Sequence, residues 1–163
     1  MIRKLAIALG LLTLPACGLR PVYGGGTHGA VATVLSSIEV ATIPDKAGWM
    51  MRNALTDRLR AAGPDTPRYR LQVTLDDRID GFGVRKDNVT TRERRTLRAR
   101  YQLVEAATNA VVLDATAASD AGIDVVSSEY SVIAAENTAL ENLTQDVADQ
   151  IIARLARYAS SSA

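Results

Sequence analysis

Alternating apolar and polar positions mark three segments in the middle of the chain, residues 68 to 80, 89 to 104 and 110 to 119. A period of two is typical of strands that bury one face, and the short connections favour sequential antiparallel pairing. The inward positions in this pattern are Tyr69, Leu71, Val73, Leu75, Leu97, Ala99, Tyr101, Leu103, Val111, Leu113, Ala115 and Ala117.

Two further segments have the helical period. From Lys46 to about Ala62 the apolar residues recur every fourth position, Asp45 can cap the start, and a Gly-Pro pair follows the end. A longer helix is predicted from about Ser128 to Tyr158. Its apolar stripe comprises Ile133, Leu140, Val147, Ile151 and Leu155.

A β-rich segment from Val34 to Ile43, with Ile38 and Val40 on one face, precedes the first helix. The order strand, helix, three strands, helix predicts an α+β fold. We expect a two-layer sandwich, an about four-stranded and mostly antiparallel sheet with two helices packed on one face. A single domain is predicted over residues 34–158, with residues 159–163 as a frayed tail.

The N-terminal segment has the features of a secretory signal. Arg3 and Lys4 precede an apolar run over residues 5–14, which is too short to span a bilayer. It ends in Leu-Pro-Ala-Cys, where Cys17 is the only cysteine of the chain. This arrangement resembles the lipobox of bacterial lipoproteins. Residues 1–16 are therefore expected to be removed, Cys17 to carry the lipid, and the glycine-rich residues 17–33 to form a flexible tether to the membrane.

Composition argues against several functional classes. The 163 residues hold 19 basic and 18 acidic side chains, and loss of Arg3 and Lys4 leaves 17 basic ones, so overall charge predicts no nucleic-acid partner. The only histidine, His28, lies in the tether. No spacing of histidines, cysteines and carboxylates fits a metal site or a nucleophile–base pair. The sequence predicts a protein that is not an enzyme and needs no cofactor.

Positive charge is concentrated in the second of the three strands and the turn before it. Period-two geometry places Glu93 and Arg95 inward, and an arginine row outward. The guanidinium group suits phosphate and carboxylate ligands. The candidate ligand-binding residues are Arg85 and Lys86 in the turn and Arg92, Arg94, Arg98 and Arg100 on the outward face.

The pairing of the first two strands decides whether these arginines meet acids. A register in which Leu75 opposes Leu97 matches the two apolar faces and sets Asp77 against Arg95. It leaves four arginines without a directly opposed acid: Arg78, Arg94, Arg98 and Arg100. Two interpretations stay open. The arginines bind an anionic ligand or partner, or they form a solvated face paired with acids on the neighbouring strand.

Several motifs together resemble one family. They are Cys-Gly-Leu-Arg-Pro-Val-Tyr-Gly from Cys17, Tyr-Arg-Leu from Tyr69, Thr-Leu-Arg-Ala-Arg-Tyr-Gln-Leu from Thr96 and Asp-Val-Val-Ser-Ser-Glu-Tyr-Ser from Asp124. With the lipobox and the element order, they are similar to the lipopolysaccharide-assembly lipoprotein family LptE in its alphaproteobacterial form.

The resemblance implies a plug inside the outer-membrane β-barrel LptD that supports barrel assembly and helps deliver lipopolysaccharide to the outer leaflet. It further implies that basic residues at one end of the sheet bind lipopolysaccharide, here Arg85, Lys86, Arg92 and Arg94. Gly18, where an inner-membrane lipoprotein commonly has Asp, favours the outer membrane. The alternative is a periplasmic adaptor lipoprotein that regulates a cell-wall synthase or an ABC transporter.

Overall fold

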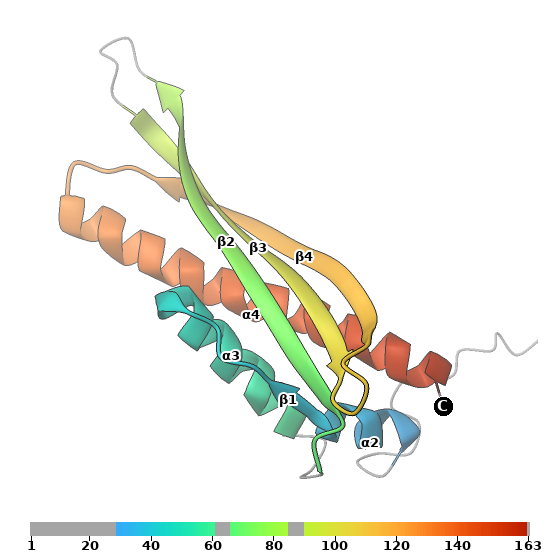
Figure 1. The fold of residues 1–163 in the computed structure, drawn as a ribbon. Helices are drawn as coiled ribbons and strands as arrows, with labels where there is room; N and C mark the ends of the chain where they lie inside the picture. Colours follow the sequence, from blue (N-terminus) through green and yellow to red (C-terminus); the bar gives the residue numbers. More distant parts are fainter. Residues whose placement is uncertain (1–28, 61–65, 85–89, 163) are drawn as a thin grey trace, which may run out of the picture.

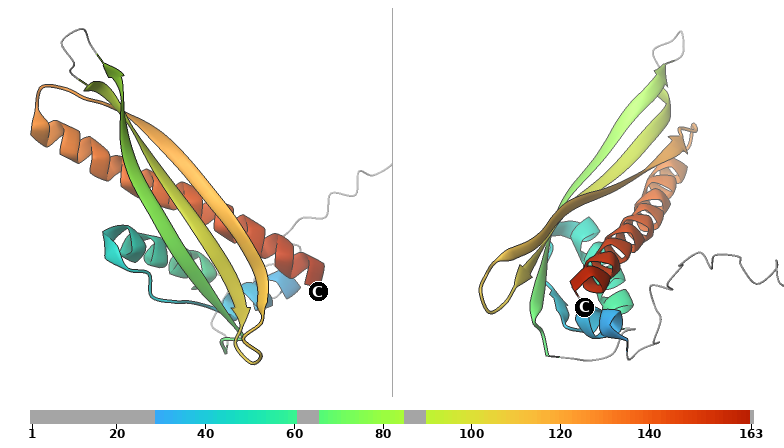
Figure 2. Two further views of the ribbon diagram at one scale, coloured as in Figure 1. Left: turned by 45° about the horizontal axis from the view of Figure 1, so that its top comes forward. Right: turned by 90° about the vertical axis from the view of Figure 1, so that its right-hand side faces the viewer.

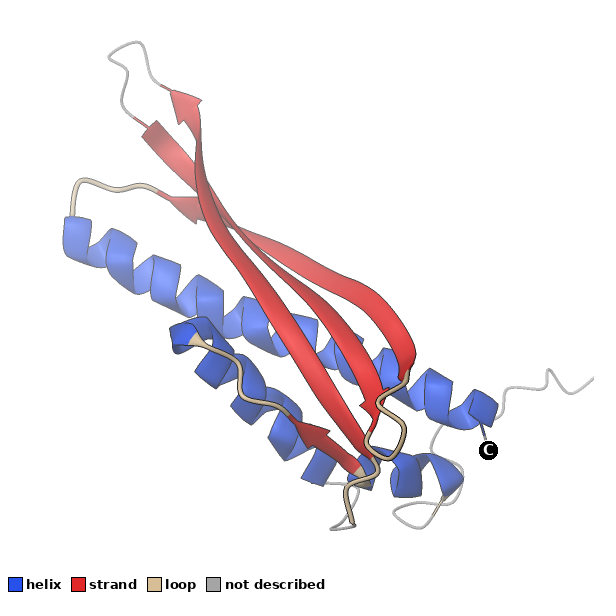
Figure 3. Ribbon diagram, in the orientation of Figure 1, coloured by secondary structure: helices blue, strands red, loops and turns tan. Residues whose placement is uncertain are grey.

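One four-stranded sheet and three helices make up the computed structural model, which describes residues 29–60, 66–84 and 90–162. The sheet order is β1 (Ile38–Val40), β2 (Tyr69–Val84), β3 (Thr90–Glu105) and β4 (Val111–Asp124). β1 pairs parallel with β2, and the other neighbours pair antiparallel. Helices α2 (Ala30–Ser36), α3 (Asp45–Arg60) and α4 (Glu129–Ser162) lie on one side of the sheet (Figures 1 and 3). The expected α+β sandwich is confirmed, with α2 as an additional helix.

The core forms where the inward faces of the strands meet α3 and α4. Leu71, Leu97 and Leu103 are fully buried from the sheet side, as the alternation predicted. Met51 and Leu55 meet them from α3, because the helical period places these residues on one stripe. No helix of the described residues covers the opposite face of the sheet, as the side view shows (Figure 2). That bare face is where the predicted arginine row lies.

The segment before β1 differs from the prediction. Residues 30–33 belong to α2 rather than to a flexible tether, and residues 34–36 are helical rather than extended. Ala32 and Leu35 are buried, so a helical spacing of three was present across the boundary between the predicted tether and the predicted strand. Only Ile38–Val40 forms a strand, with the two ends buried as expected. The predicted signal peptide and Cys17 lie outside the described residues.

Helix α4 is longer than predicted at its C-terminal end. Residues up to Ser162 are helical, so the expectation of a frayed tail is wrong for 159–162. Ala159 is fully buried, and the Ser160 hydroxyl donates to the Arg157 carbonyl at 2.8 Å. At the other end Ile133 is 49% exposed, not part of the buried stripe. The α3 helix begins opposite Asn137, so the earlier turns of α4 have no neighbouring helix.

The pairing of β2 with β3 is shifted by two residues from the predicted register. Leu75 opposes Ala99 rather than Leu97, and Leu71 opposes Leu103. A shift of two keeps every side chain on its predicted face, so apolar alternation alone does not separate the two registers. The consequence falls on the outer face, where Asp80 now opposes Arg94.

Candidate functional site

The outer face of the sheet carries the predicted arginine row. Arg92, Arg94, Arg98 and Arg100 lie on β3 with exposed side chains, and period-two geometry keeps them on one side. From Arg92 to Arg100 the row extends over on the order of 26 Å. Arg85 and Lys86, the other two candidates, lie outside the described residues. The structure therefore brings four of the six candidates together.

Most of this row is paired with acids. The predicted register left Arg94, Arg98 and Arg100 without a directly opposed acid, whereas Arg94 and Arg100 form ion pairs in the structure. The acids lie on β4. The Asp124 carboxylate accepts a hydrogen bond from Arg92 at 2.9 Å, and the Asp120 carboxylate lies 3.5 Å from Arg94. Asp114 accepts two bonds from Arg100, at 3.2 and 2.9 Å. The prediction considered only acids on β2, whereas the central position of β3 exposes the arginines to β4 as well.

Arg78 on β2 is also paired, with the carboxylate of Asp76 two residues earlier on the same face, at 2.9 Å. Arg98 opposes Asp76 in the ladder, but no ion pair within 4.0 Å joins it to a described carboxylate. It borders a shallow hollow of about 390 Å³ on the outer face. The hollow is lined by Asp76, Arg78, Asp80, Thr96 and Arg98. Among the described residues, Arg98 is thus the one arginine of the row without an ion pair.

These ion pairs are weakly held. The arginine side chains of the Arg92, Arg94 and Arg100 pairs are 57–67% exposed. Exposed pairs of this kind contribute about 0–1 kcal/mol each, so an anionic ligand can displace an aspartate at little cost. The hydrogen bond from Arg100, and to a smaller extent that from Gln102, lowers the pKa of Asp114. The hydrogen bond between Arg100 and Asp114 also raises the pKa of Arg100. The Arg100–Asp114 pair therefore remains charged at neutral pH.

The outer face ends in an aromatic contact near the β2–β3 turn. The guanidinium carbon of Arg94 lies 5.3 Å from the centre of the Phe82 ring. A cation over an aromatic face is favourable, and it holds the arginine close to the sheet. Phe82 is itself 39% exposed, so an apolar surface adjoins the charged row at this end.

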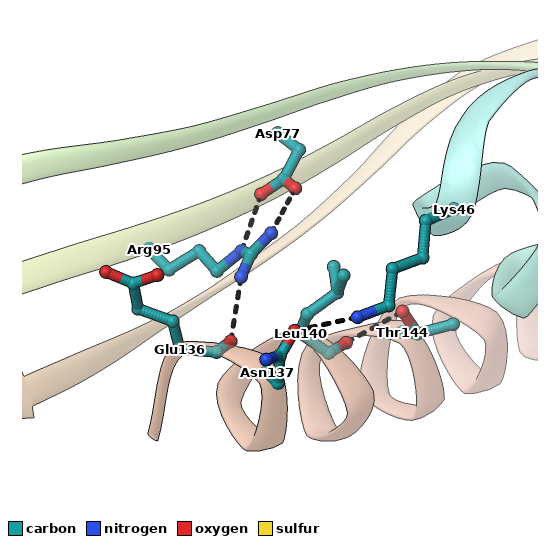
Figure 4. Close-up of polar contacts among 7 residues, drawn as sticks. All are labelled: Lys46, Asp77, Arg95, Glu136, Asn137, Leu140 and Thr144. Carbon is teal, nitrogen blue, oxygen red and sulfur yellow. Dashed lines mark hydrogen bonds and ion pairs between the residues drawn. The ribbon is translucent and has the colours of Figure 1, made fainter. Parts of the chain in front are cut away.

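On the inner face, Arg95 joins three elements. Its guanidinium binds both carboxylate oxygens of Asp77 on β2, at 2.8 and 2.5 Å, and donates to the Glu136 carbonyl of α4 at 2.7 Å (Figure 4). The hydrogen bond to Asp77 raises the pKa of Arg95. Glu93, also predicted inward, has one shielded carboxylate oxygen without a hydrogen-bond partner among the described residues. Arg95 is structural and is separate from the outer row.

A groove beside Arg95 was not anticipated from the sequence. It holds about 460 Å³ between β2, α4 and the start of α3. Lys46 spans its rim, where its ammonium donates to the Asn137 side chain at 2.7 Å (Figure 4). Its lining includes Ile43, Val73, Leu75 and Leu140. The groove forms because β2, α4 and the start of α3 come together in the fold. These segments are distant in the sequence, so no local pattern predicts it.

The described residues show no cluster of three or more His, Cys, Asp or Glu side chains able to hold a metal ion. No described helix is long and apolar enough to cross a membrane.

Solved structures with this architecture include lipoproteins of several bacteria. A proposed lipoprotein of Caulobacter crescentus is 25% identical to this chain, with a TM-score of 0.67. The match covers 83% of this chain and 98% of the Caulobacter chain. A minor lipoprotein of Acinetobacter baumannii has 14% identity, coverages of 76% and 92%, and a TM-score of 0.62. Rare lipoprotein B of Shewanella oneidensis has 8% identity, coverages of 77% and 96%, and the same TM-score, 0.62. The two less similar structures support the fold alone.

A search of curated proteins found no match to this chain. The lipopolysaccharide-assembly family model LptE, in contrast, matches residues 35–155, which include the whole sheet, all of α3 and most of α4. This range is most of the chain and coincides with the elements that the pattern of the sequence predicted. The chain belongs to the LptE family of lipopolysaccharide-assembly proteins.

Proposed function

We propose that this protein is an outer-membrane lipoprotein, anchored through Cys17, that occupies and helps to assemble an LptD-type β-barrel and takes part in delivering lipopolysaccharide to the outer leaflet. Membership of the LptE family is the observation that carries the proposal. The bare outer face of the sheet supports it, since a plug needs a polar surface to contact a polar barrel lumen.

Lipopolysaccharide is the proposed ligand of the arginine row. Its phosphates and acidic sugars match the planar donors of guanidinium groups. The row offers Arg98 without an ion pair, and three further arginines whose exposed pairs exchange readily. In the proposal, Arg85 and Lys86 extend this surface towards the turn.

Isolation of the protein from detergent-solubilised outer membranes tests the partner. We expect a large β-barrel protein to be recovered with it in a constant ratio. Recovery of partners only from the inner-membrane or peptidoglycan fraction would contradict the plug and select the adaptor function instead. The lipid anchor is tested by a separate experiment, so the result for the barrel partner and the result for the anchor can be judged independently.

Replacing Cys17 by Ser should abolish the anchor. Without the thiol no diacylglyceryl group can attach, and the signal should stay uncut. The expected band migrates more slowly on a gel and takes up no labelled fatty acid. A Ser36→Ala variant, which keeps Cys17, should be processed and labelled normally. Lipid label on Cys17→Ser would show that the attachment site lies elsewhere.

Charge reversal in the arginine row should weaken lipopolysaccharide binding. Arg94→Glu with Arg98→Glu replaces two cations by two anions on an exposed face, so we expect at least tenfold weaker binding, measured with purified lipopolysaccharide at low salt. The melting temperature should change little, because the lost pairs are solvent-exposed. Arg52→Glu with Arg60→Glu on α3 is the matched control. Equal binding by parent and double variant would exclude this face as the ligand site.

A further inference from the structure

One end of the molecule, here called the basal end, brings together several segments that carry arginines. Helix α2, the end of α3, the start of β2 and the C-terminal turns of α4 all lie there (Figures 1 and 2). The chain that leads from Cys17 also enters the described fold at this end, through α2. The exposed arginines of the basal end are Arg60, Arg68, Arg70, Arg154 and Arg157.

The charge of α4 changes sign along its length. From Glu129 to Asp149 the helix carries five acidic residues and no lysine or arginine, and from Gln150 to Ser162 it carries two arginines and no acid. Arg154 and Arg157 both precede the final turn, which is where a helix dipole favours a cation. The dipole of α4 therefore does not account for the positive charge of its last part.

Aromatic contacts bring the basic segments of β2 and α4 together. The guanidinium carbon of Arg68, which immediately precedes β2, lies 5.8 Å from the centre of the Tyr69 ring. Tyr69 in turn meets Tyr158 of α4 edge-on, with ring centres 6.5 Å apart. Tyr158 follows Arg157 in the chain, so the two rings join arginines that are almost ninety residues apart in the sequence.

Two of the basal arginines have an acid close by. Arg70 opposes Glu39 across β1 and β2. Asp57 precedes Arg60 by three residues, which places both on one side of α3. These two arginines are therefore offset locally and add little to the charge of the basal end.

The other three have no ion-pair partner within 4.0 Å among the described carboxylates, and we refer to them as the basal triad: Arg68, Arg154 and Arg157. The acids nearest to them are engaged elsewhere. Glu105, which opposes Tyr69, accepts a hydrogen bond from Thr108 at 2.7 Å. Asp149, the last acid of α4, forms an ion pair with Arg58 at 2.6 Å. The basal triad thus leaves exposed positive charge available for an external anion.

The position of the predicted anchor indicates which anion. Residues 18–29 connect Cys17 to α2, and such a length of chain spans at most about 45 Å. This connection limits the distance between the domain and the bilayer, but it does not determine which side of the domain faces the bilayer. Anionic headgroups attract arginines and repel carboxylates, so they favour contact with the basal triad over contact with the acidic part of α4.

We propose that the basal triad binds the anionic phospholipid headgroups of the bilayer that holds the anchor. The contact turns the acidic part of α4 and the far end of β2 away from that bilayer. The inference rests on the lipid anchor of the proposed function, but it requires neither lipopolysaccharide nor a barrel.

Fluorescence quenching from the bilayer surface tests this orientation. The full acylated lipoprotein is reconstituted into vesicles of phosphatidylcholine, either alone or with about 30% phosphatidylglycerol, that contain a lipid with a nitroxide on its headgroup. A fluorophore is attached at Ser160→Cys, near the basal end, or at Ser131→Cys, in the acidic part of α4. Both positions are exposed, acylated Cys17 does not react with the label, and on the order of 40 Å of helix separates the two labels.

On the anionic vesicles we expect the label at position 160 to be quenched at least about threefold more than the label at position 131. On phosphatidylcholine alone this ratio should fall by about half or more, because the zwitterionic surface attracts the arginines less. Equal quenching at the two positions on anionic vesicles, or a ratio that does not depend on phosphatidylglycerol, would overturn the inference.

Charge variants identify the surface that makes the contact. Arg154→Glu with Arg157→Glu should reduce the ratio to its value on phosphatidylcholine, whereas lysine at both positions should preserve it, because attraction to a charged surface needs the charge and not the guanidinium fork. Arg94→Glu with Arg98→Glu is the matched control on the outer face and should leave the ratio intact. If only the control variant abolishes the ratio, the arginine row faces the bilayer and the inference is wrong. Arg154→Gln with Arg157→Gln provides a second test if the glutamate variant unfolds.

Fatty-acid labelling of each sample separates this inference from the proposed function. A labelled protein without position-dependent quenching contradicts the inference and leaves the anchor in place. A protein without label contradicts the anchor, and the inference with it. Neither result depends on a barrel partner, because the vesicles contain none.

Discussion

Replacing Arg95 by Ala should destabilise the fold by about 3 kcal/mol, the lower part of the range for breaking a shielded ion pair. The Arg95 and Asp77 side chains are only 12% and 24% exposed. Loss of the guanidinium leaves the Asp77 carboxylate shielded without its partner, and the Glu136 carbonyl without its donor. Urea denaturation followed by circular dichroism measures the change.

Two controls define the cause of that loss. Arg100→Ala removes an equally well-formed pair on the exposed face and should leave the free energy of unfolding close to that of the parent. Arg95→Met with Asp77→Leu removes both charges and should recover much of the stability, because no carboxylate is left unpaired. If Arg95→Ala proves as mild as Arg100→Ala, the contact among β2, β3 and α4 contributes little to the fold.

Arg95 also shows what the sequence could reveal. The alternation of β3 placed it inward, away from the row on the other face, and that was confirmed by its contacts. The sequence also linked it to Asp77, but as a directly opposed pair. In the structure Ile79 opposes Arg95, and the guanidinium reaches Asp77 diagonally. The length of an arginine side chain permits both arrangements, so the pair did not determine the register.

The face of the arginine row was predicted correctly, but the predicted register left Arg94 and Arg100 without the acids that they meet in the structure. Period-two geometry determines the face of each residue, whereas partners depend on which strands flank β3 and in what register. The acids Asp114, Asp120 and Asp124 lie on β4, and they were available in the sequence. Considering both neighbours of a central strand would have found them. The groove beside β2 had no comparable signal, because distant segments create it.

The pairing of the row with β4 acids does not remove it as a binding surface. A face of alternating exposed charges keeps the free chain soluble, and each pair is worth too little to resist a multivalent anion. Several phosphates on one ligand molecule bind more tightly together than they would separately, because binding of the first raises the effective concentration of the others. Under the proposed function, we therefore expect lipopolysaccharide to bind by exchange of ion-pair partners, with Arg98 as the first contact.

Gly48 gives the second large expected effect, and here local propensity and packing predict opposite signs. A glycine inside a helix is unfavourable by about 1 kcal/mol relative to alanine, so propensity alone predicts that Gly48→Ala stabilises α3. An added β-carbon would lie 2.6 Å from the carbonyl oxygen and 2.7 Å from the carbonyl carbon of Ile43. These are backbone atoms of the segment that leads from β1 into α3, and they cannot rotate away.

We therefore expect Gly48→Ala to destabilise the protein by about 2 kcal/mol and Gly48→Val by more, as overpacking of a tight contact does. Gly122→Ala is the matched control, since nothing lies within 4 Å of the β-carbon it would add on β4. It should leave the free energy of unfolding within about 0.5 kcal/mol of the parent. Denaturant unfolding of the three variants measures the difference. A stabilised Gly48→Ala would mean that Ile43 can move away, and that the approach of β1 to α3 does not require glycine.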